Sequence, residues 1–476
     1  MCSNSNGTHL IISVKMINFG EINILDMSSC KKVFKLRQNT PIWHFQQDQT
    51  GVTLRASEVK PKLDKYIIAN CNGKIDATWY VNEGKTALDY KLRIYSECKC
   101  NETDKLPMFF ANLGSSKKPE SLAVSDKKAL FREVIYLEIF SLHSELLRLI
   151  EEKLSEFFIV HNFGTRQSKG FGSFSVVKDS GGVDTPELDK EYVLENGLNL
   201  KFKSFFKVMP YDDKALFKEI EVFSKSIRSG INDCKMLCFK NVGGCRFREK
   251  KWDVWQCKKK GNERCDYKHN CSVFYMKSLL FKFLDKQGIC WDKKLLKLAF
   301  NPNREEGDNS EILLWRDMLG LAERTKLFYG DVEKKGKVNE DESEATIKRF
   351  KSPVFIKPVC FADENGQEYY QVYVGCDTSI NKYGVAGRKL EIRFTRGRDG
   401  ERVERRKNAK MAQLDINGYL DYVINNGHEV IENTMSSKLH RFNEQEQTAD
   451  YTKHEFYKML KRIYSELKSN MIKKRQ

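Results

Sequence analysis

A glycine-rich stretch with two cations has the composition of a phosphate-binding loop. It runs from Val160 to Val177 with the sequence VHNFGTRQSKGFGSFSVV. Its three glycines and two cations are Gly164, Gly170, Gly172, Arg166 and Lys169. Glycines can adopt positive φ and let amide N–H groups approach a ligand, while the cations attract negative charge. The flanks FFIV (157–160) and FSVV (174–177) are expected to be short strands, which would place the loop at the edge of a sheet.

The stretch does not belong to the two commonest nucleotide-binding motifs. The pattern GxxxxGK[ST] of nucleoside-triphosphate loops is absent, and no helical pattern follows directly, as the dinucleotide-binding fingerprint requires. An ordinary hairpin connection is the alternative interpretation of the same residues.

A cluster of cysteines predicts a metal site. Six of the fourteen cysteines fall between 234 and 271, together with His269. A tetrahedral zinc site needs four thiolate or imidazole ligands, and the first set is Cys245, Cys257, Cys265 and Cys271. Cys234, Cys238 and His269 are the reserves. The excess of cysteine over histidine favours a structural zinc, and buried thiols are the alternative.

The charge of the chain favours a polyanionic partner. The 476 residues carry a formal net charge of +17, with 82 basic and 65 acidic residues. A solubilising basic surface would give the same excess. Neither a cleavable signal nor a long apolar run is present, so we expect a cytoplasmic protein with reduced cysteines and no membrane partner.

The elements before the glycine-rich stretch are expected to alternate between strands and helices. They are a strand at 8–20, a helix capped by Ser57 and ending near Ile68, strands at 85–96 and 107–112, and a helix over 125–154. The helix over 125–154 is expected because apolar residues recur there mostly every three or four residues. This succession of strands and helices suits a ferredoxin-like fold.

The region from 181 to 345 has a different texture and is predicted to be a helical insertion that carries the cysteines. Strand-like residues at 192–208 are followed by expected helices at 212–229, 272–286, 293–300 and 311–325. The highly charged residues 330–345 are expected to form an exposed loop.

Strands return near residue 350. Residues 352–361 and 368–376 predict a hairpin around the pair Asn365–Gly366, and 389–394 predict another strand. The arginine-rich run 396–410 either extends a nucleic-acid path or forms a solvated loop, and we favour the loop. Residues 451–472 are expected to be helical, ahead of the basic tail KKRQ.

Three stretches resemble the RAMP superfamily, the RNA-binding subunits of CRISPR effector complexes. The glycine-rich stretch resembles the loop of that family, written G-x-R-x-S-x-G-F-G-S. The stretch Thr40–Leu63 is similar to the family's passage into a helix with a Ser-x-[aliphatic]-Lys-Gly signature. Ser57, Val59 and Lys60 fit this signature, and Pro61 stands where the family usually has glycine. KSPVFIKPV (351–359) resembles a later strand of a type III-B subunit.

The resemblance implies a fold and a function. The fold would be α+β, with a ferredoxin-like (RRM-like) RAMP core in two parts, 1–180 and 346–476, separated by the cysteine-rich insertion 181–345. The chain would be an RNA-binding subunit of a type III-like, III-B-like CRISPR effector or related antiviral ribonucleoprotein. It would grip the sugar-phosphate backbone of guide or target RNA beside other RAMP or effector-complex subunits.

The RNA-binding candidates come from the loop and from the helix start. They are Gly164, Arg166, Lys169, Gly170, Gly172, Arg55, Ser57 and Lys60, with Trp43 and Phe171 for base stacking or for the core. His44 is the candidate base if the chain is instead a metal-independent endoribonuclease. A zinc-stabilised protein-interaction adaptor is a further alternative.

Overall fold

The structure is a computed structural model and shows a mixed α+β protein with several antiparallel sheets. It describes residues 30–42, 54–71, 73, 75–81, 83–96, 101–102, 130–131, 134–194, 199–209, 211–236, 271–290, 312–321, 324–327, 330–336, 351–381, 385–398, 401–436 and 454–472. The expected elements at 8–20, 107–112 and 293–300 lie outside these ranges.

The first sheet has four antiparallel strands in the order β2-β5-β1-β6. They are β1 (Lys31–Gln38), β2 (Lys91–Tyr95), β5 (Val134–Phe140) and β6 (Phe174–Val176). Helix α1 (Ala56–Asn70) follows β1, and helix α2 (Ser144–Val160) follows β5. The short strands β3 (Asn101–Glu102) and β4 (Leu130–Phe131) pair separately. Because β6 ends the sheet, the glycine-rich stretch lies at its edge, as predicted.

Apolar side chains on alternate strand positions join the first sheet to its helices. Leu36 of β1 and Leu137 of β5 are fully buried and belong to one cluster with Leu63 of α1 and Ile150 of α2. Val33, on the opposite side of β1, is 48% exposed. The helices therefore cover one face of this sheet.

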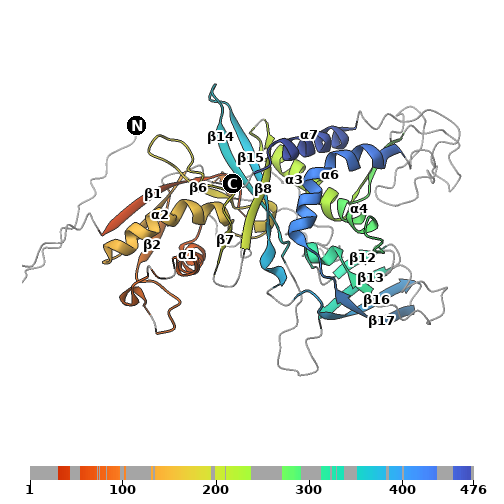
Figure 1. The fold of residues 1–476 in the computed structure, drawn as a ribbon, viewed down its shortest axis with the longest axis horizontal. Coiled ribbons are helices and arrows are strands. Elements are labelled where there is room, and N and C mark those ends of the chain that lie inside the picture. Colours follow the sequence, from red (N-terminus) through yellow and green to blue (C-terminus); the bar gives the residue numbers. More distant parts are fainter. Residues whose placement is uncertain are drawn as a thin grey trace, which may run out of the picture.

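The second sheet lies beside the first and is built from distant parts of the chain (Figure 1). Its order is β14-β15-β8-β7. The strands are β7 (Tyr192–Val193), β8 (Asn199–Val208), β14 (Val354–Ala362) and β15 (Glu368–Asp377). Its helices are α3 (Asp213–Arg228), α6 (Ile416–Ser436) and α7 (Glu455–Ser469), and α3, α6 and α7 contact β8.

The third sheet lies at the other end of the molecule from the first (Figure 1). Its order is β11-β17-β16-β13-β12. The strands are β11 (Ile312–Leu314), β12 (Arg324–Leu327), β13 (Gly330–Gly336), β16 (Lys389–Arg398) and β17 (Glu401–Met411). The hairpin of β9 (Ile231–Met236) and β10 (Cys271–Met276) and helix α4 (Leu279–Asp285) complete the described elements.

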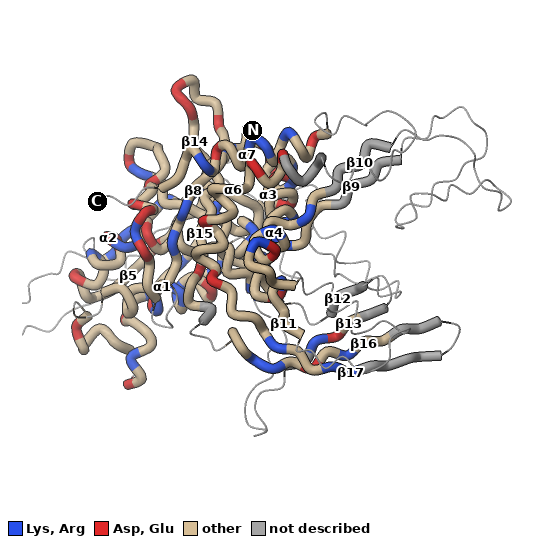
Figure 2. The backbone as a smooth tube through the Cα atoms, turned by 45° about the vertical axis from the view of Figure 1, so that its right-hand side comes forward, with Lys and Arg blue, Asp and Glu red and all other residues tan. Residues whose placement is uncertain are grey.

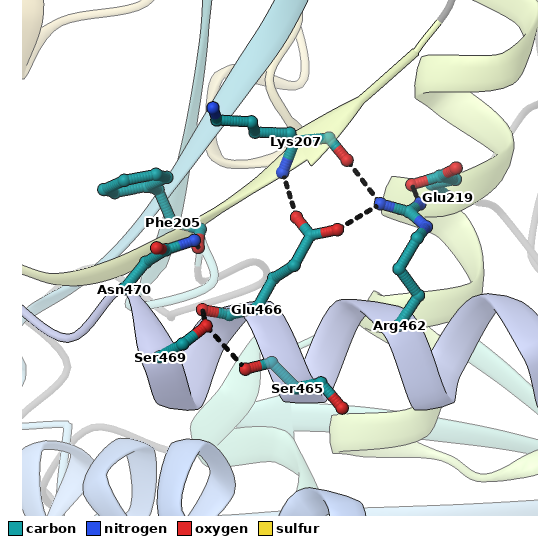
Figure 3. A network of polar contacts seen from close by, with 8 residues as sticks. All are labelled: Phe205, Lys207, Glu219, Arg462, Ser465, Glu466, Ser469 and Asn470. Atoms are coloured by element: carbon teal, nitrogen blue, oxygen red, sulfur yellow. Dashed lines mark hydrogen bonds and ion pairs between the residues drawn. The ribbon is translucent and has the colours of Figure 1, made fainter.

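Beyond its short pairing with β7, the edge of β8 is covered by side chains of helix α7 (Figure 3). The backbone N–H of Lys207 donates to Glu466 at 2.6 Å, and Arg462 donates to the carbonyl of Lys207. Arg462 also binds Glu466 at 3.0 Å and pairs with Glu219 of α3. Exposed strand edges invite pairing with other chains, so this helix protects the second sheet.

Several predicted elements are confirmed. Asp212 caps α3, where its side chain accepts hydrogen bonds from the amides of Lys214 and Ala215. β14 and β15 form the expected hairpin, and Gly366 in its turn has a φ of 78°. The expected helix at 451–472 corresponds to α7, and FSVV contributes β6. No helix among the described residues is both long and apolar enough to cross a membrane.

The predicted long helix at 125–154 is wrong at 134–140, while its residues 125–129 lie outside the described ranges. Residues 134–140 form β5, and α2 begins only at Ser144. Ile135 and Ile139 are four positions apart, a spacing that satisfies both helical and strand periodicity. Leu137 between them is buried on the same face, as only the strand allows. FFIV, predicted as a strand, is the last turn of α2.

The prediction of a helical insertion is not confirmed. The expected helix at 311–325 is replaced by β11, a 3₁₀ turn (Arg316–Leu319) and β12, and 272–276 belong to β10. The charged residues 330–336 form β13. Within the arginine-rich run, residues 396–398 belong to β16 and residues 401–410 to β17, so these parts form paired strands and not the expected loop. Within the predicted insertion, β8 pairs with β15 and β13 pairs with β16.

Candidate nucleic-acid interface

The glycine-rich loop links the end of α2 to β6 through a left-handed backbone. Gly164, Gly170 and Gly172 have φ values of 74°, 80° and 65°, which confirms the conformational role predicted for them. Arg166 also has a positive φ, 63°, and precedes a 3₁₀ turn (Gln167–Lys169). A left-handed non-glycine residue is uncommon and is held here by the surrounding turn.

At Gly172 the backbone of the loop passes very close to the backbone of Phe163. A Cβ placed on it would lie 2.0 Å from the carbonyl oxygen of Phe163. The two residues are joined by a hydrogen bond from Phe163 N to Gly172 O at 2.9 Å, and Gly172 N donates to Pro41 O at 2.9 Å. Only glycine fits at this point without a shift of the backbone.

The glycine amides are directed inward, which corrects the expectation that they face a ligand. Gly164 N donates to Glu58 Oε1 at 2.9 Å, Gly172 N is bound to Pro41, and Gly170 N points to Gln167 O at 3.4 Å. The glycines therefore shape the loop, and contacts with an anion must come from side chains at its surface.

A buried lysine holds the base of the loop. Lys357 of β14 is fully buried, and its Nζ donates to Phe158 O (2.8 Å), His161 O (3.0 Å), Asn162 Oδ1 (3.2 Å) and Phe174 O (3.0 Å). Burial pushes the pKa of Lys357 well below its ordinary value. The four oxygen acceptors and the negative end of the α2 dipole favour the ammonium form. Lys357 thus joins the second sheet to the end of α2 and to β6.

Side chains of the first sheet and loop also bind the free edge of β14. The bonds are Asn162 Nδ2 to Ile356 O (3.0 Å), Ser173 Oγ to Pro358 O (2.5 Å) and Cys360 N to Asn39 Oδ1 (3.1 Å). Thr40 Oγ1 donates to Gly170 O at 2.7 Å from the end of β1. The three stretches singled out in the sequence therefore meet at this loop.

The two loop cations occupy a partly dehydrated position. Both side chains are half-buried, and the guanidinium of Arg166 lies 6.0 Å from the ring of Phe171. Burial lowers the pKa of Arg166 to about 10. Burial, together with the nearby charge of Arg228, lowers the pKa of Lys169 to about 7. A bound phosphate would stabilise both charges, which burial disfavours.

Two hydroxyls accompany these cations in the loop. Thr165 and Ser168 are half-buried and make no side-chain hydrogen bond with any residue that the structure describes. Hydroxyl groups beside cations are common phosphate ligands. Figure 2 shows Lys and Arg positions on elements of all three sheets, so the overall positive charge does not by itself single out the loop.

The three RNA-binding candidates at the start of α1 do not contact the loop through any of the bonds described for them. Arg55 is the residue before α1 and Ser57 is exposed within its first turn, so Ser57 is not the cap. Lys60 Nζ binds Asp64 Oδ2 (3.0 Å) and Leu88 O (2.9 Å), which ties its charge to internal partners. Its contact with the Tyr90 ring, at 4.0 Å, belongs to the same cluster.

Glu58 and Lys62 connect α1 to the loop, and neither is among the predicted RNA-binding residues. Lys62 Nζ donates to Glu58 Oε1 at 3.0 Å and to Asn162 O at 3.3 Å, and it lies 4.6 Å from the ring of Phe163. Burial lowers the pKa of Lys62. The spacing of four between Glu58 and Lys62 is the sequence signal that could have indicated this pair.

The remaining candidates are either core residues or outside the described ranges. Phe171 is fully buried and stacks on Phe217 with ring centroids 3.9 Å apart, so it is a core residue and not a base-stacking one. Trp43 and His44 lie outside the described residues.

The predicted zinc site cannot be placed on the described part of the chain. Cys245, Cys257 and Cys265 lie outside it, and for Cys271 only the backbone is described. The described residues contain no group of three potential metal ligands. Zinc therefore stays a prediction.

Comparison with known proteins identifies the family. A model described as the Cmr1 N-terminal domain matches residues 29–231, and one described as the Cmr1 C-terminal domain matches 275–454. No curated protein matches the chain. The solved structure of Cmr1 from Pyrococcus furiosus (apo form) matches with a TM-score of 0.32 and 10% identity, covering 73% of this chain and 88% of that one. Because the two family models span more than half of its length, the chain belongs to the Cmr1 family of RAMP proteins, a membership that implies a subunit of a type III-B CRISPR effector complex.

Proposed function

We propose that this chain binds the sugar-phosphate backbone of guide or target RNA with its glycine-rich loop. The observation that carries the proposal is the position of Arg166 and Lys169, two partly dehydrated cations on a loop held by the end of β1, the first turn of α1 and the middle of β14. A fixed loop loses little conformational freedom when it binds, and a phosphate at its surface would attract both cations.

The arrangement of the first sheet supports a ferredoxin-like RAMP core. In chain order its elements are β1, α1, β2, β5, α2 and β6, and the strand order β2-β5-β1-β6 is the one expected for a split βαβ fold. The second sheet repeats part of this plan, because β8 is followed by α3 and lies next to β15 of the β14–β15 hairpin. A core in two parts is therefore the proposed organisation, with both parts contacting the loop.

The proposal is tested by measuring RNA affinity over a range of salt concentrations. In Arg166→Ala/Lys169→Ala, affinity should fall for all RNA sequences, because phosphate contacts carry no sequence information. If each cation neutralises one phosphate of a single strand, the slope of log affinity against log salt should fall by about 1.4.

A matched control removes two cations elsewhere. Lys178 and Lys190 have 52% and 56% exposed side chains, with ion pairs to Asp184 (3.2 Å) and Glu156 (3.5 Å). Lys178→Ala/Lys190→Ala changes the net charge equally and should leave the salt slope close to that of the unmodified chain. Equal losses in both double variants would show that net charge, and not the loop, determines binding.

A further inference from the structure

The face of the first sheet that α1 and α2 leave uncovered carries aromatic rings and cations together. On β1 and β5, the side chains facing the helices are buried, and those on the opposite face are exposed or half-exposed. This opposite face, here called the open face, carries three rings, Tyr95, Tyr136 and Phe140, and, besides the ion-paired Lys31 and Arg37, the cations Lys35, Lys91 and Arg93.

The strand register places each ring beside a cation. Lys35 of β1 and Tyr95 of β2 both pair with Tyr136 on the central strand β5, and Lys91 pairs with Phe140. The Tyr95 and Tyr136 rings stack, with centroids 5.4 Å apart and planes inclined by 21°. The guanidinium of Arg93 lies 5.3 Å from the Tyr95 ring. The open face therefore carries a cluster in which aromatic rings and cations lie next to each other.

The open face has an excess of positive charge. Its carboxylate, Glu138, is already paired with Lys31 at 2.8 Å. Lys35, Lys91 and Arg93 form no ion pair with any residue in the described ranges. Arg37, further along β1, binds Glu368 of β15 at 2.5 Å, and this pair limits the open face on the side of the second sheet.

We propose that the open face binds single-stranded RNA, with bases stacked on Tyr95 and Tyr136 and phosphates held by Lys35, Lys91 and Arg93. Every base has a π face, so aromatic side chains stack on bases of any sequence, and nearby cations follow the backbone. The absence of an unpaired carboxylate among the described residues of this face favours a polyanion over a basic partner.

The open face and the glycine-rich loop are connected by one strand. β1 carries Lys35 on the open face and continues to Thr40, whose hydroxyl binds Gly170 of the loop at 2.7 Å. Five residues of extended chain span about 17 Å. The inference rests on the proposed RNA-binding function, but it assigns a second and separate surface to it.

The test compares variants that remove the rings with variants that keep them. The probe is a fluorescently labelled oligouridine of about 12 nucleotides, bound to the full chain and followed by anisotropy. Tyr95→Ala/Tyr136→Ala should weaken binding by roughly 5- to 150-fold for each stacked base lost. Tyr95→Phe/Tyr136→Phe keeps both rings and should bind within about twofold of the unmodified chain.

A second variant, substituted only at exposed lysines, tests the open face even if the tyrosine variant fails to fold. Lys35→Gln/Lys91→Gln leaves the core untouched and should lower the salt slope by about 1.4 if both cations contact phosphate. Normal affinity and slope in this variant, together with normal affinity in a folded Tyr95→Ala/Tyr136→Ala, would overturn the proposal.

The outcomes separate this inference from the proposed function. Weakening by Arg166→Ala/Lys169→Ala alone would support the loop and overturn the open face. Weakening by the open-face variants alone would support the open face and overturn the assignment to the loop. Absence of any binding by the unmodified chain at low salt would overturn both.

Discussion

Substituting Gly172 tests whether the loop is held in one conformation by its close backbone approach. In Gly172→Ala the new Cβ would lie 2.0 Å from Phe163 O, so the carbonyl must retreat by about 1.4 Å to reach an ordinary 3.4 Å contact. That movement disrupts the hydrogen bonds from Phe163 N to Gly172 O and from Gly172 N to Pro41 O, both 2.9 Å long.

The expected loss is the sum of three effects. A positive φ costs alanine about 1–2 kcal/mol, two disrupted hydrogen bonds cost about 1 kcal/mol each, and the remaining crowding adds a similar amount. We expect the free energy of unfolding to fall by about 4–5 kcal/mol, a large part of the 5–15 kcal/mol typical of a domain. RNA affinity should fall with it, because the Arg166 guanidinium would no longer be fixed.

Gly181 provides the matched control. It also has a positive φ, 81°, but a Cβ there would meet nothing within 4 Å. Gly181→Ala should therefore lose only the conformational term of about 1–2 kcal/mol. Thermal unfolding would show a midpoint lower by about 2–8 °C for Gly181→Ala and by about 8–20 °C for Gly172→Ala. Equal midpoints for the two variants would refute the reasoning.

Two further predictions concern the lysines around the loop. Lys357→Met removes the donor for four buried oxygens and also the cost of burying an ammonium, so we expect the free energy of unfolding in urea to fall by about 2–4 kcal/mol. Lys207 occupies an exposed position of β8, so Lys207→Met should change this free energy little. Equal effects of the two substitutions would contradict the role of Lys357. Since the pKa of Lys169 is about 7 and a phosphate would raise it, binding should take up a proton, and affinity should fall by up to about tenfold per pH unit above pH 7. Lys169→Arg stays charged and should flatten this dependence, whereas a slope equal to that of the unmodified chain would rule out Lys169 as its source.

The sequence predicted the loop better than the elements around it. Positive φ at Gly164, Gly170 and Gly172 could be predicted from the sequence, because glycine adopts this conformation more readily than any other residue. The assignment of 134–140 to a helix failed because Ile135 and Ile139 fit both periodicities, and pairing with β1 and β2 decides between them. Such pairing depends on residues far apart in the chain.

Helix α6 shows how a turn signal can mislead. It contains Asn417–Gly418 and Asn426–Gly427, pairs that are typical of turns, and no helix was expected there. Gly427 is needed for a different reason, because a Cβ on it would lie 2.2 Å from the Tyr464 ring of α7. Close contact between two helices selects this glycine, and only the tertiary structure reveals it.

The stretches of chain that form the candidate site could be predicted from the sequence, but the contacts between them could not. Lys357 lies within KSPVFIKPV, which resembles a RAMP strand, yet only the structure shows that its ammonium holds α2 and β6. Lys60 fitted the family signature and is bound to Asp64, whereas Lys62, two positions later, reaches the loop. Side-chain direction on a helix turns by about 100° per residue, so a small shift in position changes the partner.

The most direct test of RNA binding within an effector complex is to isolate the chain from its native cells. The tagged protein would be purified under mild salt, the RNA that accompanies it sequenced and the co-purifying proteins identified. The account predicts short RNAs that share a repeat-derived end, together with other effector subunits, and a reduced RNA yield for Arg166→Ala/Lys169→Ala. A protein free of both RNA and effector subunits would contradict it.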